Sequence, residues 1–140
     1  MPPVVIDHNI LFAALRSRDS HTRRKLLEAP FQFYTPNYLV VELFKHRPRI
    51  VAKSNASEEE ILVYLTKITS KLHFFSEEHI STGNFIEAYR LCNDVDENDT
   101  TYVALTLELS GLLWTRDEEL KSGLRRKGFD RFLDESLLNA

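Results

Sequence analysis

Carboxylates are concentrated in one stretch of the chain, from Asn93 to Lys121. The stretch begins with a dense acidic loop, continues with a helical apolar run, and ends in a short apolar strand followed by Thr115-Arg116-Asp117. In an α/β protein, a carboxylate at a helix start and another after the C-terminal end of a strand can fall on the same edge of the sheet, where such folds place their sites. The stretch is therefore a candidate metal site.

Four acidic residues of the whole chain either follow a predicted strand, open a helix or interrupt an apolar helix face: Asp7, Glu42, Asp99 and Asp117. Each has a simpler explanation, because Asp is favoured at helix N-caps, where it contributes roughly 1 kcal/mol, and Glu42 has Lys45 or His46 within helical reach. Taken together, however, like charges on one sheet edge repel unless something neutralises them. Asp96 is a candidate supporting acid beside them.

A divalent cation would neutralise such a group of carboxylates. Mg²⁺ prefers oxygen ligands, and Mn²⁺ accepts similar ones. A zinc site is disfavoured because Cys92 is the single cysteine and the five histidines lack convincing paired spacing. Four carboxylates suit one or two ions, and two ions can activate a water and stabilise the leaving oxygen of a phosphodiester. Hydrolysis would then need no protein nucleophile.

The elements that must position these carboxylates alternate along the chain. Strands are predicted over 4–6, 31–34, 72–75 and 112–114, with a fifth over 129–133. Helices are predicted over 9–16, 20–28, from 38 onward, 57–70, 81–92, 100–109 and 118–127. We expect Asn37 to cap the third helix, Pro48 to bend or end it, and Gly111 to end the sixth. Strands that alternate with helices predict an α/β fold with parallel pairing.

Composition bounds the class of protein. The 140 residues, of which 43% are apolar, fit one domain spanning 1–140. A single cysteine excludes an internal disulfide framework and favours a reduced, cytoplasmic setting. The N-terminal apolar segment is interrupted by Asp7, His8 and Asn9, so we interpret it as a core strand and not as a signal peptide. No apolar run is long enough to span a membrane.

The net charge of −3 argues against a protein that holds nucleic acid by bulk electrostatics alone. The basic residues are nevertheless clustered, at 23–25, at 45–47 together with Arg49 and Lys53, and at Lys121 together with 125–127. Each cluster is either a solvated helix face or a local basic patch beside the acidic pocket, and the sequence leaves both interpretations open.

The order of the carboxylates carries a resemblance to a known family. Asp7 in VVIDHNILFAAL, Glu42 in TPNYLVVELFKH, Asp99 in DENDTTYVALTLELSG and Asp117 in LLWTRDEEL together resemble the PIN-domain family, to which the VapC-type toxin ribonucleases belong. The resemblance implies a three-layer α/β/α sandwich around a mainly parallel sheet of four to five strands. It also implies an endoribonuclease that uses Mg²⁺ or Mn²⁺ to cut single-stranded RNA.

The same resemblance assigns roles to residues. Asp7, Glu42, Asp99 and Asp117 would be both the catalytic residues and the metal ligands, and Asn9 and Thr115 would be hydrogen-bonding residues that orient them. The chain departs from the family pattern at His8, Thr106 and Arg116, where smaller residues are common, so these positions bear on substrate fit.

The resemblance also implies partners. A cognate antitoxin and a second copy of the chain are expected, with RNA as the substrate. A dimer would add basic clusters to a groove beside each site, and Arg125, Arg126 and Lys127 are the candidate RNA-binding residues.

Three alternatives remain at this stage. The chain could be a PIN-fold binding module whose acidic pocket docks a basic segment without turnover, or a PIN nuclease of RNA processing or decay with no toxin role. A phosphotransfer domain with Asp7 as acceptor is disfavoured, because Asn9 stands where a second Asp is found in phosphatases of the haloacid-dehalogenase type and the segment 112–116 has no Lys.

Overall fold

Four short parallel strands form a single sheet in the order β3-β2-β1-β4. The structure, a computed structural model, describes residues 1–138. The strands are β1 (Val4–Ile6), β2 (Phe33–Pro36), β3 (Leu72–Phe75) and β4 (Leu112–Trp114). In the centre of the sheet, Val4 pairs with Phe33 on one side and with Leu112 on the other. The predicted parallel pairing is thus confirmed.

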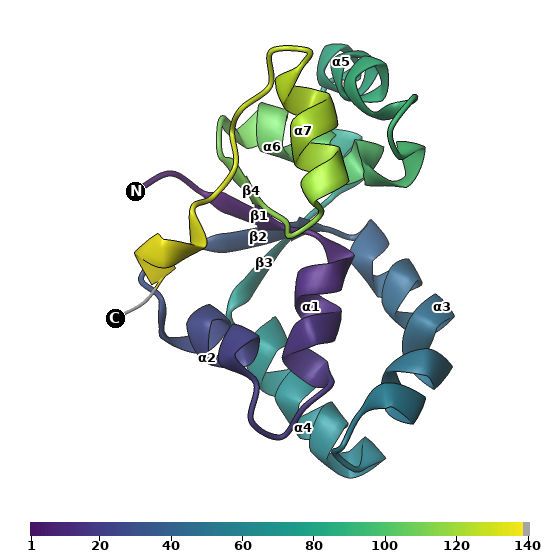
Figure 1. The fold of residues 1–140 in the computed structure, drawn as a ribbon, viewed down its shortest axis with the longest axis vertical. Helices are drawn as coiled ribbons and strands as arrows, with labels where there is room; N and C mark the ends of the chain where they lie inside the picture. Colours follow the sequence, from purple (N-terminus) through teal and green to yellow (C-terminus); the bar gives the residue numbers. More distant parts are fainter. Residues whose placement is uncertain (139–140) are drawn as a thin grey trace.

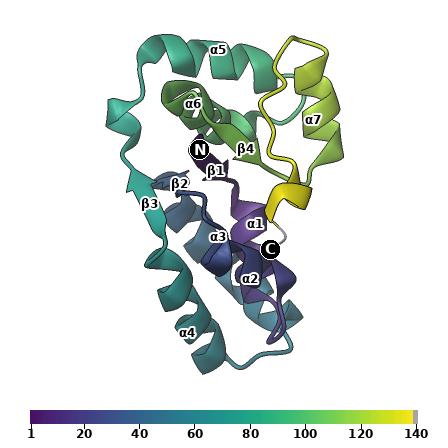
Figure 2. The same cartoon turned by 90° about the vertical axis from the view of Figure 1, so that its left-hand side faces the viewer.

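Helices cover both faces of this sheet, which gives three layers (Figure 1). The helices α1 to α4 lie on one side and α5 to α7 on the other, as the perpendicular view also shows (Figure 2). Their bounds are α1 (His8–Leu15), α2 (His21–Glu28), α3 (Tyr38–Lys53), α4 (Glu58–Thr69), α5 (Thr82–Cys92), α6 (Thr100–Leu109) and α7 (Glu118–Arg125). Short 3-10 helices are η1 (Glu77–His79), η2 (Glu97–Asp99) and η3 (Glu135–Leu138). The expected α/β/α sandwich is confirmed.

The core is divided by the sheet into two apolar clusters. Alternate side chains of a strand point to opposite faces, so Val4 and Ile6 pack with α1 to α4, whereas Val5 packs with α5 to α7. All three side chains are fully buried, as expected for a parallel sheet covered on both faces. The sheet therefore fixes the positions of the residues that directly follow its strands.

The strand order creates one topological switch point. From β1 the chain proceeds outward through β2 to β3 on one side, and then returns to place β4 on the other side of β1. In open parallel sheets, ligands bind beyond the carboxyl ends of the strands that flank such a point. Those ends are followed here by Asp7 and by Thr115-Arg116-Asp117.

Two predicted elements have different bounds in the structure. The second strand lies at Phe33–Pro36 and not at 31–34, because its extent is set by pairing with β3, from Phe33 opposite Leu72 to Pro36 opposite Phe75. Pro36 is tolerated because β2 pairs with β1 only through Phe33 and Tyr34, so the sheet needs no N–H from Pro36 on that side. The fifth strand is wrong: only Phe132 makes an isolated bridge to β4.

The expected signals at helix ends were also partly wrong. Pro48 does not end α3, which continues to Lys53. A helical proline frees the carbonyl four residues earlier, and that residue, Phe44, is exposed on the surface where water can bind the carbonyl. Asn37 makes no side-chain cap bond, because its backbone is helical and not extended.

Gly111 has a different role from the expected one. The helix α6 ends at Ser110, which adopts the left-handed conformation at φ 49°. A Cβ on Gly111 would lie 2.4 Å from the carbonyl oxygen of Pro3. Glycine therefore permits the close approach of β4 to the chain entering β1, and this approach places the ends of the two strands side by side.

None of the helices within residues 1–138 combines the length and apolar character that crossing a bilayer requires.

Candidate active site at the carboxyl edge of the sheet

Asp7 directly follows β1 and is almost fully buried. One carboxylate oxygen accepts a 3.0 Å hydrogen bond from the backbone N–H of Ile10 and so caps α1, as predicted. Burial raises the pKa of Asp7 above its usual value, although hydrogen bonds from the Thr115 hydroxyl and the Ile10 amide act in the opposite direction. Asp7 is thus held by two elements in a fixed orientation.

Thr115 and Asp117 form the turn that follows β4. Asp117 caps α7 by accepting a 3.0 Å hydrogen bond from the Leu120 amide, as predicted, and it is only half-buried. The Thr115 hydroxyl oxygen accepts a 3.2 Å bond from the Asp117 amide. The buried Thr115 also lowers the pKa of Asp7, so it acts on both of the acidic residues that follow β1 and β4. The orienting role that the family resemblance implies for Thr115 stays a prediction.

Glu42 enters the site from α3 and has a partner, as its position on an apolar face required. Its side chain is 4% exposed, and one carboxylate oxygen lies 3.3 Å from Nε2 of His46. The His46 ring is held in turn by a stacked contact with His8 at 6.2 Å and an edge contact with Phe12 at 5.4 Å. Burial, followed by the nearby Glu42 carboxylate, raises the pKa of Tyr38.

Asp99 differs from the other three acidic residues because it does no structural work that the structure shows. It occupies the N-cap position of α6 but its side chain makes no cap hydrogen bond, and it is 5% exposed. The N-cap explanation therefore fails for this residue. Burial raises the pKa of Asp99 to about 7, and four like charges contribute further: Asp7, Asp96, Asp117 and Glu42. The fold thus brings all four predicted site residues within electrostatic reach of one another.

Tyr102 lies among these carboxylates and was not predicted. It is fully buried on α6, and within residues 1–138 its hydroxyl has no hydrogen-bond partner. Burial raises the pKa of Tyr102, as do the charges of Glu42 and Asp7. The sequence offers no signal for this position, because a tyrosine on the inward face of an apolar helix is indistinguishable from a core aromatic residue.

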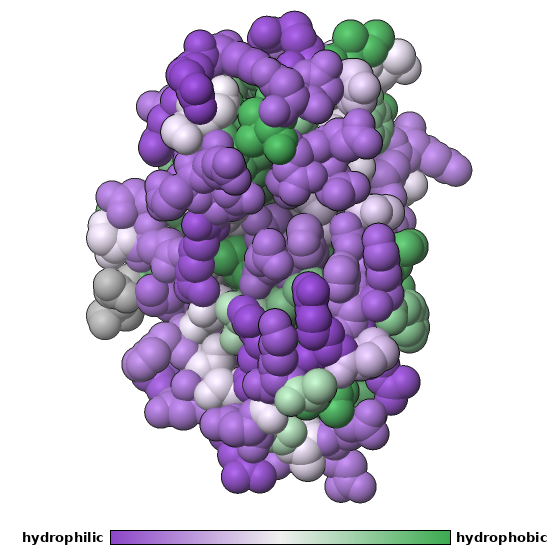
Figure 3. All heavy atoms as spheres, turned by 45° about the vertical axis from the view of Figure 1, so that its right-hand side comes forward, coloured by the Kyte–Doolittle hydropathy of each residue, from purple (hydrophilic) through white to green (hydrophobic). Residues whose placement is uncertain are grey.

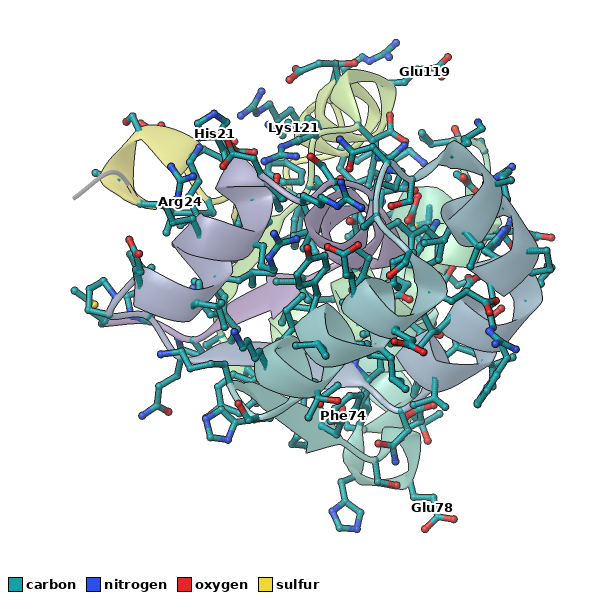
Figure 4. All side chains as sticks on the ribbon, turned by 90° about the horizontal axis from the view of Figure 1, so that it is seen from below. His21, Arg24, Phe74, Glu78, Glu119 and Lys121 are labelled. Atoms are coloured by element: carbon teal, nitrogen blue, oxygen red, sulfur yellow. The ribbon has the colours of Figure 1, made fainter. Side chains whose placement is uncertain are left out.

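The supporting acid Asp96 and a further acidic residue, Glu119, lie at the periphery. Asp96 is exposed and caps the short η2 helix by accepting a 3.0 Å bond from the Asn98 amide, while its charge still reaches Asp99. Glu119 points away from the body of the molecule at the outer side of α7 (Figure 4). Asn9 is exposed on α1, where it lines a small hollow facing α3. The role predicted for Asn9 stays a prediction.

The basic triplet after α7 is engaged within the protein. Nε of Arg125 lies 2.7 Å from a carboxylate oxygen of Asp130. Nζ of Lys127 pairs with Asp94 and donates to the carbonyls of two residues at the C-terminal end of α5. Arg126 donates only to the carbonyl of Ser122, at 3.3 Å. Their role in RNA binding stays a prediction, but two of the three charges already have carboxylate partners.

The donor set has the chemistry that a hard divalent cation needs. The carboxylates supply oxygen ligands, and three of them are buried. They repel one another, and a bound cation would relieve that repulsion. Within residues 1–138, however, no three Asp, Glu, His or Cys side chains converge closely enough to make a ligand set. The charge and donor type therefore fit Mg²⁺ or Mn²⁺, while the present side-chain positions leave the donors apart.

An apolar groove of the surface lies elsewhere. It has a volume of about 440 Å³, runs between α3 and α4 past Phe44 and Leu62, and contains none of the predicted site residues. The face turned forward in Figure 3 is mostly hydrophilic, and hydrophobic atoms gather only in separate small areas. The chemistry is thus concentrated at the carboxylate edge and not in the groove.

Comparison with known proteins agrees with this arrangement. A search of curated proteins gave no match. The model of one protein family, described as PIN domain, matches residues 5–135 and so includes all four carboxylates. PIN domains are generally nucleases and typically use divalent metals. Since the match spans nearly the whole chain, this protein belongs to the PIN-domain family.

Proposed function

We propose that the protein is a metal-dependent endoribonuclease that hydrolyses phosphodiester bonds in single-stranded RNA. The observation that carries the proposal is Asp99, a buried carboxylate without a cap bond, whose pKa is raised to about 7 beside three further acidic residues. An isolated buried charge destabilises a fold. Asp99 makes no cap bond for the fold, and its burial is unfavourable for its charge. Such a residue is expected at a functional site, where a bound ligand offsets the cost of the buried charge.

Asp7, Glu42, Asp99 and Asp117 would hold one or two Mg²⁺ or Mn²⁺ ions. When bound, the metal would polarise the phosphodiester and lower the pKa of an attacking water. The protein's own contribution is positioning: Thr115 fixes Asp7 relative to Asp117, and His46 fixes the Glu42 carboxylate. Such outer partners typically change metal affinity or activity by about 10- to 100-fold when removed.

Cleavage of a labelled single-stranded RNA tests the proposal. The purified protein should cut the RNA in the presence of Mn²⁺, and EDTA should stop the reaction. Asp99→Asn should lower the rate by about 10³-fold, because a metal supplies several kcal/mol of transition-state stabilisation. Asp96→Asn is the matched control, since Asp96 is exposed and caps η2. Cleavage that survives both chelation and Asp99→Asn would point to a contaminating nuclease and refute the assignment.

A second candidate is a catalytically silent PIN-fold module whose acidic pocket docks a basic segment of a partner. One observation favours it: no three of the potential ligand side chains within residues 1–138 converge on a common point. The same assay separates the two proposals. A binding module would leave RNA intact at every Mn²⁺ concentration, and would bind a Lys/Arg-rich peptide with an affinity that Asp99→Asn weakens.

The biological role rests on the resemblance to VapC-type ribonucleases. We propose that the protein acts as the toxin of a toxin-antitoxin pair, as a homodimer whose site is blocked by a cognate antitoxin. Expression should then arrest cell growth, and a small neighbouring reading frame should relieve the arrest. Growth that continues despite verified ribonuclease activity would favour a role in RNA processing or decay.

A further inference from the structure

Three basic side chains gather at a hollow between α1 and α3 that has no assigned role. Arg16, at the end of α1, faces Arg49 and Lys53 in the last two turns of α3, and the hollow between them has a volume of about 60 Å³. Asn9, Phe12 and Ile50 complete its walls, so no acidic residue lines it. The three basic residues are exposed to solvent.

The charges of these three residues are unbalanced. Within residues 1–138, Arg16, Arg49 and Lys53 take part in no ion pair and their side chains donate no hydrogen bond to the protein. Basic residues elsewhere are commonly paired, as Arg18 is with Glu60 and Arg116 with Glu135. Three like charges in one place repel, and an anion would relieve the repulsion.

The hollow lies between α1, which Asp7 caps, and α3, which carries Glu42. Figure 1 shows α1 and α3 leaving the sheet side by side, and the contact of Phe12 with His46 at 5.4 Å confirms that they pack together. Asn9, two residues after Asp7, reaches the hollow itself. Arg49 follows Glu42 by seven residues, which places it about 10.5 Å further along the helix axis. An RNA strand that leaves the carboxylate site along this seam would meet the three basic residues.

Size and charge identify the ligand class. A hollow of about 60 Å³ corresponds to roughly two water volumes of about 30 Å³ each. A hollow of this size can seat the two anionic oxygens of a phosphodiester. Arginine presents a planar fork that matches phosphate geometry, and two of the three residues are arginines. An acidic peptide would meet the same charges, but nothing would require its site to lie beside buried carboxylates.

We infer that Arg16, Arg49 and Lys53 form a phosphate-binding subsite that holds the RNA backbone on the helix seam beyond the carboxylate site; this inference rests on the proposed ribonuclease function. The subsite explains how a chain of net charge −3 binds RNA beside an acidic pocket. It provides local positive charge on the helix seam that leads away from the carboxylates, independently of a second copy of the chain.

Fluorescence anisotropy with a labelled single-stranded RNA tests the subsite without cleavage. The measurement uses the Asp99→Asn protein at constant Mg²⁺, with and without Arg16→Gln/Arg49→Gln. The double variant should bind about tenfold more weakly, and its plot of log affinity against log salt should be shallower by about 1.4, or about 0.7 per lost phosphate contact. Arg16→Lys/Arg49→Lys, which keeps the charges, should recover part of the affinity.

The matched control is Lys67→Gln/Lys71→Gln, which removes the same charge from two exposed residues outside the hollow that have no ion pair within residues 1–138. This control should change RNA affinity less than twofold. Equal losses in both double variants would mean that only bulk charge matters, and would overturn the subsite. A double variant that loses affinity for a poly-glutamate peptide but keeps its affinity for RNA would overturn it in favour of a protein partner.

Cleavage kinetics separate the subsite from the proposed function. In the otherwise unchanged protein, Arg16→Gln/Arg49→Gln should raise KM with kcat nearly constant, because the lost contacts are made equally in the ground state and the transition state. Unchanged KM and unchanged RNA affinity in a protein that cuts RNA would refute the subsite alone. A protein that never cuts RNA, but whose RNA affinity depends on these two arginines, would refute the ribonuclease proposal and leave the subsite intact.

Discussion

Two charged regions of this protein look alike in sequence and differ in the fold. In the region around the end of α7, which we call the paired region, Arg125 and Lys127 each have a carboxylate partner. The second region, which we call the unpaired region, comprises the carboxylate edge of the sheet and the seam between α1 and α3. There the buried Asp99 and the exposed Arg49 form no ion pair within residues 1–138.

This difference separates charges that stabilise the fold from charges that are available to a ligand. Charges of the paired region stabilise the native state, because each was given a partner by the packing of α7 against α5 and the C-terminal segment. Charges of the unpaired region cost stability or contribute nothing to it, which is expected for groups that await a ligand. Removing a charge should therefore destabilise the paired region, and should stabilise the unpaired region or leave its stability unchanged.

The largest effect is expected at Asp99 in metal-free protein. Its pKa is about 7 in the folded state and near 3.8 in the unfolded chain, so between these values the folded state holds a proton that the unfolded state releases. Stability consequently falls as pH rises from about 4 to about 7, and the full cost is present above pH 7. Asp99→Asn should raise the free energy of unfolding by about 2 to 4 kcal/mol at pH 8.

Thermal unfolding in EDTA at several pH values measures this effect. The melting temperature of Asp99→Asn should exceed that of the unmodified protein at pH 8 and approach it at pH 4. Asp96→Asn serves as the control because Asp96 is exposed. A melting temperature that drops at pH 8 in Asp99→Asn would show that this carboxylate stabilises the fold, and would erase the contrast between the two regions.

The next effect is expected at Lys127 and has the opposite sign. Its ammonium group donates to the carbonyls of Arg90 and Leu91 at 3.1 and 3.0 Å and pairs with Asp94, so it satisfies the C-terminal end of α5. Lys127→Met should lower the free energy of unfolding by about 1 to 2 kcal/mol.

Urea unfolding of Lys127→Met, with Lys67→Met as control, measures this loss. Lys67 is exposed and has no ion pair within residues 1–138, so its replacement should stay within about 0.5 kcal/mol. If the two variants unfold at the same urea concentration, the contacts of Lys127 contribute nothing to stability. The claim that the paired region stabilises the fold would then be wrong.

The smallest effects on stability are expected at Arg125 and Arg49, and here RNA binding makes the distinction. Arg125 forms an exposed ion pair of the kind that contributes about 0.2 to 1 kcal/mol, and Arg49 forms none within residues 1–138. Arg125→Gln and Arg49→Gln should both unfold nearly like the unmodified protein, while only Arg49→Gln weakens RNA binding. A greater loss of RNA affinity in Arg125→Gln would restore the triplet after α7 as the RNA-binding surface.

Local signals explain what the sequence predicted correctly. Asp7 and Asp117 precede helices and cap them as expected, because a cap bond spans only three residues. The alternation of strands and helices predicted the parallel sheet. The positions of four carboxylates relative to those elements predicted one acidic sheet edge, where Asp7, Asp117 and Glu42 help to raise the pKa of Asp99. Both inferences use the topology of α/β folds and need no side-chain detail.

Tertiary contacts explain what the sequence could not predict. The bounds of β2 depend on its register with β3, and no residue within β2 indicates that register in the sequence. Whether a basic residue is free depends on acidic residues that are distant in sequence: Lys127 meets Asp94 only because α7 packs against the end of α5. Arg16 and Lys53 likewise become neighbours only when α1 and α3 pack together.

The central claim is that the carboxylate edge of the sheet binds a divalent cation, and calorimetric titration with Mn²⁺ tests it most directly. We expect saturable binding to the unmodified protein, at least tenfold weaker binding to Asp99→Asn, and little change in Asp96→Asn. Mn²⁺ binding that is absent from the unmodified protein, or equally strong in all three proteins, would contradict it.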